Sequence, residues 1–373
     1  MAGPAGTTQA LDIAVLPGDG IGREVMDACL ELLEAVQKAM RMPRLHCTVH
    51  PAGAQHYAAS GEALPGATLA AARRADAVLF GAMGWPDIRY PDGTEPIPQL
   101  DLRMALDLYA GVRPIRWFPG LPKVLSDPRA EQMDFVLIRE QTEGLFYSRG
   151  KGTVEKDSEA YDTMQITRRG TSRVSDFAFR LAAQRKAAGR PSRVTCVDKS
   201  NVFTSMAFFR KVFDDVAAQH PDIAKNYAYV DAMALDMVRK PWTLGVLVTE
   251  NMFGDILSDL AAGLIGGMGM ASSADIGDDH GLFQPAHGTA PDIAGQGKAN
   301  PAAMFLSAAL MLDWLSHRHS EPSLARAARS IERALEQVLA TKAAVPMEYG
   351  GEAGTAAMTK AVIAALPKVV IPA

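Results

Sequence analysis

Short apolar runs rich in β-branched residues alternate with longer amphipathic segments along most of the chain. The apolar runs predict strands at 11–17, 46–51, 76–82, 109–115, 134–140, 193–198, 226–231 and 244–250. The amphipathic segments predict helices at 21–40, 64–74, 172–188, 202–219, 255–265, 301–316, 322–341 and 353–365. Because strands that alternate with helices pair mainly in parallel, we predict an α/β protein.

One stretch, residues 146–168, interrupts this alternation with polar, glycine-containing and partly alternating sequence. It predicts either an arm-like ribbon or a surface loop. At 373 residues the chain is longer than one ordinary hydrophobic core, so two lobes are expected. No linker-like or repeated segment marks a boundary between them, which indicates that continuous elements connect the lobes.

Composition narrows the classes of partner. The 38 basic and 42 acidic residues give a net charge of −4, so no surface for nucleic acid or an anionic membrane is expected. Three cysteines without metal-ligand spacing are expected as small buried residues in a reducing compartment. The N-terminal residues lack a signal-peptide pattern, and the longest apolar window, 260–274, is broken by glycines and too short to span a bilayer. We therefore expect a cytoplasmic protein.

The glycines after the first predicted strand, in "LPGDGIGREV" at 16–25, raise the question of a dinucleotide site. Gly18 and Gly20 match the first two positions of the G-x-G-x-x-G fingerprint, but Arg23 takes the third. The acid expected about 20 residues further on is missing as well. We expect a tight strand-to-helix turn with a role in the active site, and a conventional Rossmann site is the alternative.

Three arginines stand where an anion is expected. Arg103 and Arg113 lie in "LDLRMALDLYAGVRP", and Arg139 closes the apolar run "FVLIRE". A buried arginine is costly without a partner, and its guanidinium matches a carboxylate in a two-pronged way. Structural salt bridges would explain such residues, and so would a binding site for a di- or tricarboxylate.

A pair of acids predicts a metal site. Asp255 and Asp259 lie four residues apart at the start of a predicted helix and therefore project from one face. Two such carboxylates favour a hard divalent cation, Mg²⁺ or Mn²⁺, with Asp231 as a candidate third ligand. Alternatively, Asp255 complements the helix dipole and Asp259 is solvated.

Two loops complete the candidate chemistry. Lys199 and Asn201 follow a predicted strand in "CVDKSNVF", where an amine near a cation and arginines could act as a general base. A capping loop with a solvated lysine is the alternative. The loop 283–301 contains His287 and Asp292, and an acid there could accept both hydroxyls of an adenosine ribose.

Taken together, these features resemble the isocitrate/isopropylmalate dehydrogenase family of β-decarboxylating dehydrogenases over about residues 11–312. The most specific segments are "ENMFGDILSDL" and "HGTAPDIAGQGKANP". The resemblance implies a two-lobed α/β fold with a parallel or mixed sheet flanked by helices, not a conventional Rossmann domain. It places residues 1–108 and 266–373, with both termini and most of the NAD site, in the first domain. Residues 109–265, with the dimer interface, the arm and the metal and catalytic residues, form the second.

The family uses NAD(P)⁺ and a divalent metal to oxidise the hydroxyl of a 3-substituted malate, usually with loss of CO₂. The resemblance implies that Arg103, Arg113 and Arg139 bind the malate carboxylates, and that Asp255 and Asp259 bind Mg²⁺ or Mn²⁺. It also implies that the partner subunit supplies Asp231 as a metal ligand and Lys199 for proton transfer. These roles predict a homodimer with shared active sites.

Cofactor residues follow from the same resemblance. They are Ile21, Asn201, His287, Gly288, Thr289, Ala290, Asp292 and Asn300. Among them, Asp292 would repel the 2′-phosphate of NADP⁺, so NAD⁺ is the expected cofactor.

The sequence departs from the family pattern at the substrate. Phe146 stands where the family has a tyrosine that protonates the substrate carbon, and Tyr147 follows it. Either a local bulge brings Tyr147 into the site, another group or water supplies the proton, or the reaction stops at the ketone.

Substrate choice is the second departure. Gln99 and Leu100 should face the variable group of the substrate, and they match neither the paired leucines of isopropylmalate enzymes nor the Ser and Asn pattern of isocitrate enzymes. A 3-isopropylmalate-like substrate is the preferred expectation. Tartrate, D-malate, isocitrate and homoisocitrate are alternatives, as is a non-catalytic regulatory role.

Overall fold

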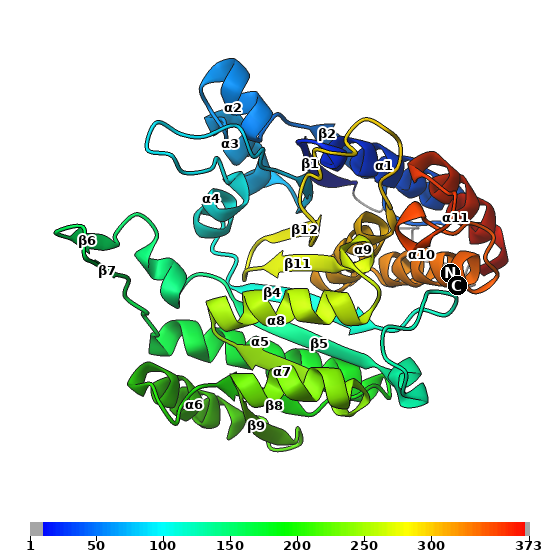
Figure 1. Cartoon of the computed structure of the whole chain (residues 1–373). Helices are drawn as coiled ribbons and strands as arrows, with labels where there is room; N and C mark the ends of the chain where they lie inside the picture. The colour runs from blue at the N-terminus through cyan, green and yellow to red at the C-terminus, as the bar shows by residue number, and fades with distance from the viewer. Residues whose placement is uncertain (1–9, 370–373) are drawn as a thin grey trace, which may run out of the picture.

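A ten-stranded sheet lies at the centre of the computed structural model, which describes residues 10–369 (Figure 1). Its strands are β1 (Leu11–Gly18), β2 (Leu45–Val49), β3 (Ala77–Ala82), β4 (Ala110–Arg116), β5 (Asp134–Glu140), β8 (Val194–Asp198), β9 (Lys225–Tyr229), β10 (Val246–Thr249), β11 (Ser272–Ile276) and β12 (Gly281–Pro285). They are ordered β2-β1-β3-β12-β11-β4-β5-β10-β8-β9. Two further strands, β6 (Thr153–Glu155) and β7 (Glu159–Tyr161), pair as a separate ribbon that projects from the body. The predicted α/β class is confirmed.

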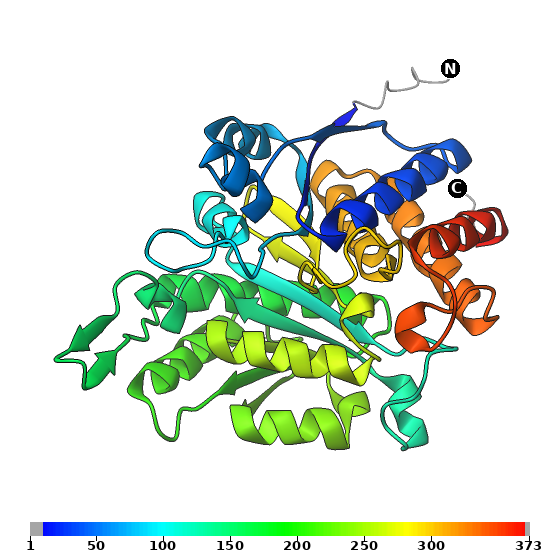
Figure 2. The same cartoon turned by 45° about the horizontal axis from the view of Figure 1, so that its top comes forward.

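Helices cover both faces of the sheet (Figure 2). They are α1 (Ile21–Ala39), α2 (Ala54–Ser60), α3 (Gly66–Arg74), α4 (Pro98–Ala105), α5 (Arg168–Ala187), α6 (Thr204–Ala217), α7 (Val230–Arg239), α8 (Asn251–Leu264), α9 (Ala302–His319), α10 (Pro322–Ala340) and α11 (Thr355–Val369). No helix in the described part of the chain is long and apolar enough to cross a membrane.

Strand direction changes in the middle of the sheet. The strands β2, β1, β3 and β12 are mutually parallel, and so are β5, β10, β8 and β9. Between these two sets, β12, β11, β4 and β5 pair antiparallel. Residues 11–82 and 272–285 thus supply one half of the sheet, and residues 110–249 supply the other. The two-domain division stays a prediction, since one sheet and one hydrophobic cluster run through both halves.

Alternating side chains give each half of the sheet two buried faces. In β3 and β12, Leu79 and Phe283 belong to the cluster formed with α1 and α9, whereas Val78 and Leu282 pack with Leu102 of α4. In the other half, α5 contacts α6 and α7 contacts α8. The helices α4 and α8 both lie on the face that carries the candidate site described below.

Several elements were not predicted from the sequence. Each predicted strand and helix overlaps an observed one, but β11, β12, α2, α4 and α7 are additional. The predicted strand 226–231 was wrong at its end, because β9 stops at Tyr229 and Asp231 lies in the first turn of α7. An acid in the first turn complements the helix dipole, which favours helix over strand at this position.

The turn "LPGDGIGREV" contacts three other segments of the chain, at Ala54, Gly84 and Thr289. The buried carboxylate of Asp19 accepts backbone N–H bonds from Ala54 at 2.7 Å and Gly84 at 3.0 Å. Gly20 has φ of 55°, and a Cβ there would lie 2.2 Å from the carbonyl oxygen of Thr289. The turn therefore packs directly against the loop that contains the expected cofactor residues.

Composition predicted buried cysteines and no signal peptide. Cys29 and Cys196 are buried, Cys47 is partly buried, and all three are free thiols. The expected absence of a signal peptide concerns the N-terminus, of which residues 1–9 lie outside the described residues.

Candidate active site

A cavity of about 260 Å³ lies between α4, α8 and the ends of β3 and β12, with β4 and β5 beside it. Many of the site residues predicted from the sequence line this cavity. They are Gln99, Leu100, Arg103, Arg113, Arg139, Asp255, Asp259, His287 and Gly288. The structure thus brings the three arginines and the two acids of α8 to one place.

Two of the arginines share a buried counter-charge. Arg103 Nε lies 2.8 Å from Asp275 Oδ2, and Arg113 Nη1 lies 3.2 Å from Asp275 Oδ1. Asp275 is fully buried, and Gln141 and Gln284 also donate to its carboxylate, at 2.9 and 3.0 Å. Every oxygen of this carboxylate therefore has a hydrogen-bond partner.

Electrostatics keeps Asp275 ionised. Burial alone would raise its pKa, but the charges of Arg103 and Arg113 lower the pKa of Asp275 to about 2. The salt bridges expected as an alternative to carboxylate binding are present for these two arginines, and Arg139 forms one with Asp255. These salt bridges do not exclude carboxylate binding, because all three guanidinium groups also line the cavity.

The third arginine is held differently. Arg139 donates from Nε and Nη2 to Asn251 Oδ1, at 2.9 and 2.7 Å, and forms an ion pair with Asp255. Burial, with a contribution from the charge of Arg103, lowers the pKa of Arg139 to about 10. Close packing of α8 on β5 depends on Gly254, since a Cβ there would lie 2.7 Å from the Arg139 side chain.

The acids of α8 fit a divalent cation. The helix begins at Asn251 and is capped by Glu250, which accepts from the backbone N–H of Phe253 at 2.7 Å, so Asp255 is not the residue that caps it. Burial and repulsion from Asp255 raise the pKa of Asp259 above its ordinary value. Two carboxylates that disfavour each other's charge, lining a cavity with oxygen atoms, are suited to Mg²⁺ or Mn²⁺.

The side of the cavity next to α4 differs in polarity from the arginine side. Ile97, Leu100 and Phe146 line it, together with Gln99, whose buried Oε1 has no hydrogen-bond partner among residues 10–369. Phe146 lies in a 3-10 helix, Leu145–Ser148. Tyr147 is outside the cavity lining, with the ammonium of Lys151 3.7 Å from its ring centroid.

Lys199 and Asp231 lie together, but away from the cavity lining. Lys199 Nζ is 2.6 Å from Asp231 Oδ1, and Asn201 is exposed in the same loop. The loop is fixed by buried Asp198, which accepts from Arg210 Nε at 2.7 Å and from the backbone N–H of Ser200 at 2.8 Å. Lys199 is therefore paired rather than freely solvated.

The expected cofactor residues follow β12. His287 and Gly288 line the cavity, and the backbone N–H of Ile21 donates to the carbonyl oxygen of Thr289 at 2.9 Å. Burial lowers the pKa of His287, and its Nε2 has no partner within the described residues.

Further along the same loop, Ala290 adopts a positive φ of 38° and Asp292 is exposed. Asn300 donates to Glu348 Oε2 at 3.1 Å. An exposed acid and a buried ring nitrogen without a partner, on a loop that meets the cavity, fit a ligand with ribose hydroxyls and hydrogen-bonding groups.

Sequence reasoning missed the residue that joins the arginines. Asp275 lies in "SSADI", whose single β-branched residue, Ile276, does not identify a strand, and its two arginine partners are 172 and 162 residues away in sequence. The turn-forming "GDDHG" that follows, between β11 and β12, was the signal for this hairpin.

An α/β sheet with a cavity that joins buried arginines to paired carboxylates is typical of enzymes that bind small carboxylates. Comparison with known proteins identifies the family: its model, described as isocitrate/isopropylmalate dehydrogenase, matches residues 12–363. The chain belongs to this family, which confirms both the resemblance and the expected fold class.

The relatives cover nearly the whole chain. It is 41% identical over 353 residues to the 3-isopropylmalate/3-methylmalate dehydrogenase of Methanocaldococcus jannaschii, covering 94% of this chain and 97% of that protein. It is 40% identical to the 3-isopropylmalate dehydrogenase of Desulfotalea psychrophila, covering 95% and 99%. The crystal structure of isocitrate dehydrogenase from Methylococcus capsulatus aligns with a TM-score of 0.83 at 35% identity, covering 96% and 99%.

The buried cluster predicts a large and pH-dependent effect of Asp275→Asn. Removing the charge leaves two buried guanidinium groups without their shared partner, so the free energy of unfolding at neutral pH should fall by about 3–5 kcal/mol. Because the folded pKa of about 2 is below the ordinary value of 3.8, this advantage of the wild type exists above pH 3.8 and is lost as the pH falls toward 2. Chemical denaturation between neutral pH and about pH 3 measures it.

The matched control for this experiment is Asp279→Asn, an exposed acid in the turn of the same hairpin. It should leave the free energy of unfolding within about 0.5 kcal/mol of the wild type. Equal stability of Asp275→Asn and wild type at neutral pH would contradict the account, and so would a difference that grows on acidification.

Proposed function

We propose that the protein is an NAD⁺- and divalent-metal-dependent dehydrogenase that oxidises and decarboxylates a 3-substituted malate. The observation that carries this proposal is the convergence of Arg103, Arg113 and Arg139 with Asp255 and Asp259 on one cavity. The family and the names of its members support a decarboxylating dehydrogenase. The intact set of charged residues favours an enzyme over a non-catalytic regulatory subunit.

Charge balance supports a dicarboxylate substrate. The three guanidinium charges around the cavity are matched by three carboxylates, Asp255, Asp259 and Asp275. A divalent cation held by the two acids of α8 would leave two positive charges, which a malate dianion neutralises. Its carboxylates would meet arginines that are already fixed by Asp275 and Asn251, so little side-chain entropy is lost on binding.

The residues of the chain supply orientation and proton transfer. Arg103, Arg113 and Arg139 would hold the carboxylates and align the C2 hydroxyl. Lys199 Nζ, positioned by Asp231, would receive the hydroxyl proton in its uncharged amine form. When bound, the metal would stabilise negative charge on the substrate oxygens, and NAD⁺ would accept the hydride.

In this arrangement Tyr147 does not line the cavity, so it cannot donate the proton that the substrate carbon needs after decarboxylation. Phe146 lines the cavity and Tyr147 does not. The Cζ of Arg139 lies over the Phe146 ring, 5.2 Å from its centroid. We propose that water protonates the substrate carbon after CO₂ leaves.

NAD⁺ is the proposed cofactor. His287 and Gly288 would meet it at the cavity, and the exposed acid of Asp292 would accept the ribose hydroxyls. A 2′-phosphate at the same place would be repelled by this carboxylate, which favours NAD⁺ over NADP⁺.

The proposed substrate is 3-isopropylmalate or a close relative. Ile97, Leu100 and Phe146 offer apolar contacts to a branched alkyl group, and the names of the relatives agree with this choice. One observation favours a second candidate: the buried Oε1 of Gln99 has no partner in the described residues, and a hydroxyl such as that of tartrate would supply one.

Lys199 and Asp231 would serve the active site of a partner subunit. They form a pair outside the cavity lining, and exposed apolar side chains lie nearby on the surface. These are Val202, Phe203, Leu235, Val238 and Ile256. A second copy of the chain that covers them would form the proposed homodimer.

A substrate panel tests the proposed reaction. Purified protein is assayed with 3-isopropylmalate, isocitrate, homoisocitrate, tartrate and D-malate, with NAD⁺ or NADP⁺, and with Mn²⁺ or after metal removal. We expect Mn²⁺-dependent NADH formation, fastest with 3-isopropylmalate, and an NAD⁺ preference of at least about tenfold in kcat/KM. One CO₂ should form for each NADH. Absence of metal-dependent reduction with every substrate would refute the proposal.

Mixing inactive variants tests whether the active sites are shared. Lys199→Met and Asp255→Asn should each be nearly inactive alone. If Lys199 acts in the partner's site, subunit exchange assembles one complete site in each mixed dimer and restores about a quarter of the wild-type activity. The control mixture, Lys199→Met with Asp231→Asn, should stay inactive because both residues come from the same subunit. No recovery in the first mixture of folded proteins would place Lys199 in its own subunit's site.

A further inference from the structure

The ion pair between Arg139 and Asp255 differs from the other ion pairs of the arginine-lined cavity, the cavity of about 260 Å³ that the three arginines line. Arg103 and Arg113 pair with Asp275, which is fully buried and is not among the residues that line the cavity. Asp255 does line the cavity, and its side chain is 51% exposed. The charged partner of Arg139 is therefore a residue that a ligand in the cavity can reach.

Two proposed ligands compete with this ion pair. In the proposed function, Arg139 binds a substrate carboxylate and Asp255 binds a divalent cation. The contact between Arg139 Nη1 and Asp255 Oδ1 occupies both groups, so either ligand has to displace it. The first ligand to bind frees the group that the second one needs, and the second ligand then binds more tightly. The pair thus couples the metal position to the substrate position.

Asn251 holds Arg139 independently of Asp255. Its Oδ1 accepts from Nε and Nη2 of Arg139, at 2.9 and 2.7 Å, whereas Nη1 is the atom paired with Asp255. The amide of Asn251 is oriented in turn, because its Nδ2 donates to the backbone oxygen of Glu143 at 3.1 Å. Asn251 is buried, so water does not compete for these hydrogen bonds. Arg139 can therefore change its charged partner at Nη1 while its side chain stays in place.

We propose that Arg139 exchanges Asp255 for a substrate carboxylate when the cation binds to Asp255, and that Asn251 is the positioning residue that holds Arg139 during this exchange. The inference rests on the proposed function, because it uses the metal and substrate positions assigned there. It adds a coupling between the two ligands that acts through the residues of the chain, besides any direct contact between metal and substrate. This coupling requires the ion pair and not only the negative charge of Asp255.

Binding of a dicarboxylate without metal tests the exchange. Isothermal titration calorimetry measures 3-isopropylmalate binding in EDTA and without NAD⁺, so that no reaction occurs. Asp255→Asn and Asp259→Asn each remove one negative charge of α8 from the same cavity, and of the two acids only Asp255 is paired with Arg139. We expect Asp255→Asn to bind 3-isopropylmalate at least about threefold more tightly than Asp259→Asn, because Arg139 no longer has to leave a partner. Equal affinities of the two variants would overturn the inference.

An Arg139→Met background separates the ion pair from simple charge repulsion. Without the guanidinium group, Asp255→Asn and Asp259→Asn should bind 3-isopropylmalate equally, because each then removes only repulsion. An advantage of Asp255→Asn that persists in this background would show that the ion pair is not its cause.

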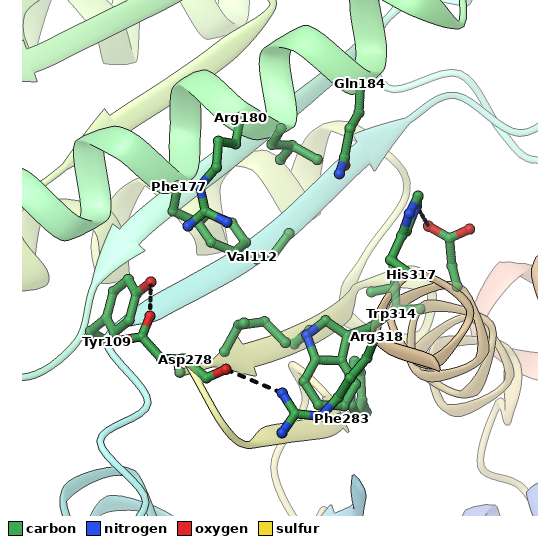
Figure 3. A pocket seen from close by; sticks show the side chains of 16 residues that line it. Tyr109, Val112, Phe177, Arg180, Gln184, Asp278, Phe283, Trp314, His317 and Arg318 are labelled. Carbon is green, nitrogen blue, oxygen red and sulfur yellow. Dashed lines mark hydrogen bonds and ion pairs between the residues drawn. The ribbon is translucent and has the colours of Figure 1, made fainter. Parts of the chain in front are cut away.

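A remote acid is the control for the loss of one charge. A second cavity, of about 360 Å³, lies on the other face of the sheet, where Val112 lines it (Figure 3). The next residue, Arg113, lines the arginine-lined cavity instead, because neighbouring residues of a strand point to opposite faces. In the second cavity, Asp313 lies 4.0 Å from His317. Asp313→Asn should bind 3-isopropylmalate as the wild type does, and a tightening equal to that of Asp255→Asn would overturn the inference.

Asn251→Ala tests the positioning role. Loss of the amide oxygen leaves Arg139 without its second anchor, so the KM for 3-isopropylmalate should rise at least about tenfold while kcat falls less than about threefold. A merely structural role would lower the amount of folded, active protein without this selective effect on KM. An unchanged KM in the folded variant would remove Asn251 from the proposal.

Crystal structures of the wild type test the exchange without any substitution. With 3-isopropylmalate in EDTA, or with Mn²⁺ alone, Arg139 Nη1 should no longer contact Asp255, whereas Nε and Nη2 should still contact Asn251. A ligand bound beside an intact pair of Arg139 and Asp255 would overturn this inference and leave the proposed function standing. Failure of both ligands to bind in the cavity would overturn the inference and the proposed function together.

Discussion

The ion cluster around Asp275 is the constraint on which the arginine-lined cavity depends. Arg103 and Arg113 lie 172 and 162 residues from Asp275 along the chain, and both arginines are more than nine-tenths buried. An unpaired guanidinium in such surroundings would cost several kcal/mol, so neither could stay there without a counter-charge. Asp275 supplies that charge to both at once, and Gln141 and Gln284 satisfy the rest of its oxygens. The two arginine side chains are thus fixed in place without any ligand.

The placement of Asp275 follows from the unusual centre of the sheet. In the hairpin of β11 and β12, β11 is antiparallel to β12 on one side and to β4 on the other. In the register of this pair, Asp275 is opposite Gly111, where a Cβ would lie 2.4 Å from the amide of Gln141. The absence of a side chain at Gly111 leaves room for the buried network.

Long, strongly periodic elements were predictable, and short buried ones were not. The helices α1 and α10 and the strand β5 were foreseen within a few residues because their hydrophobic pattern repeats over several turns or over the whole strand. The strand β11 contains two serines and an aspartate, and only its buried position between β12 and β4 makes it a strand. Likewise, α4 has eight residues and starts at Pro98, too short for a clear helical period.

The chemistry of the site divides in the same way. Motifs with local spacing, such as the two acids of α8 or the loop with His287, identified residues that do line the cavity. The partner of Arg103 could not be found from spacing, since Asp275 is 172 residues away. Nor could spacing show that Phe146 lines the cavity and Tyr147 does not, because that depends on a 3-10 helix between β5 and the ribbon.

The central claim is that the cavity of Arg103, Arg113 and Arg139 is the receptor for a metal-bound malate dicarboxylate. A crystal structure of the protein with Mn²⁺ and 3-isopropylmalate tests it most directly, because anomalous scattering locates the metal independently of the protein geometry. We expect an anomalous peak at the carboxylates of Asp255 and Asp259, with the substrate carboxylates on the three arginines. A peak elsewhere, or a substrate bound without contact to these arginines, would contradict it.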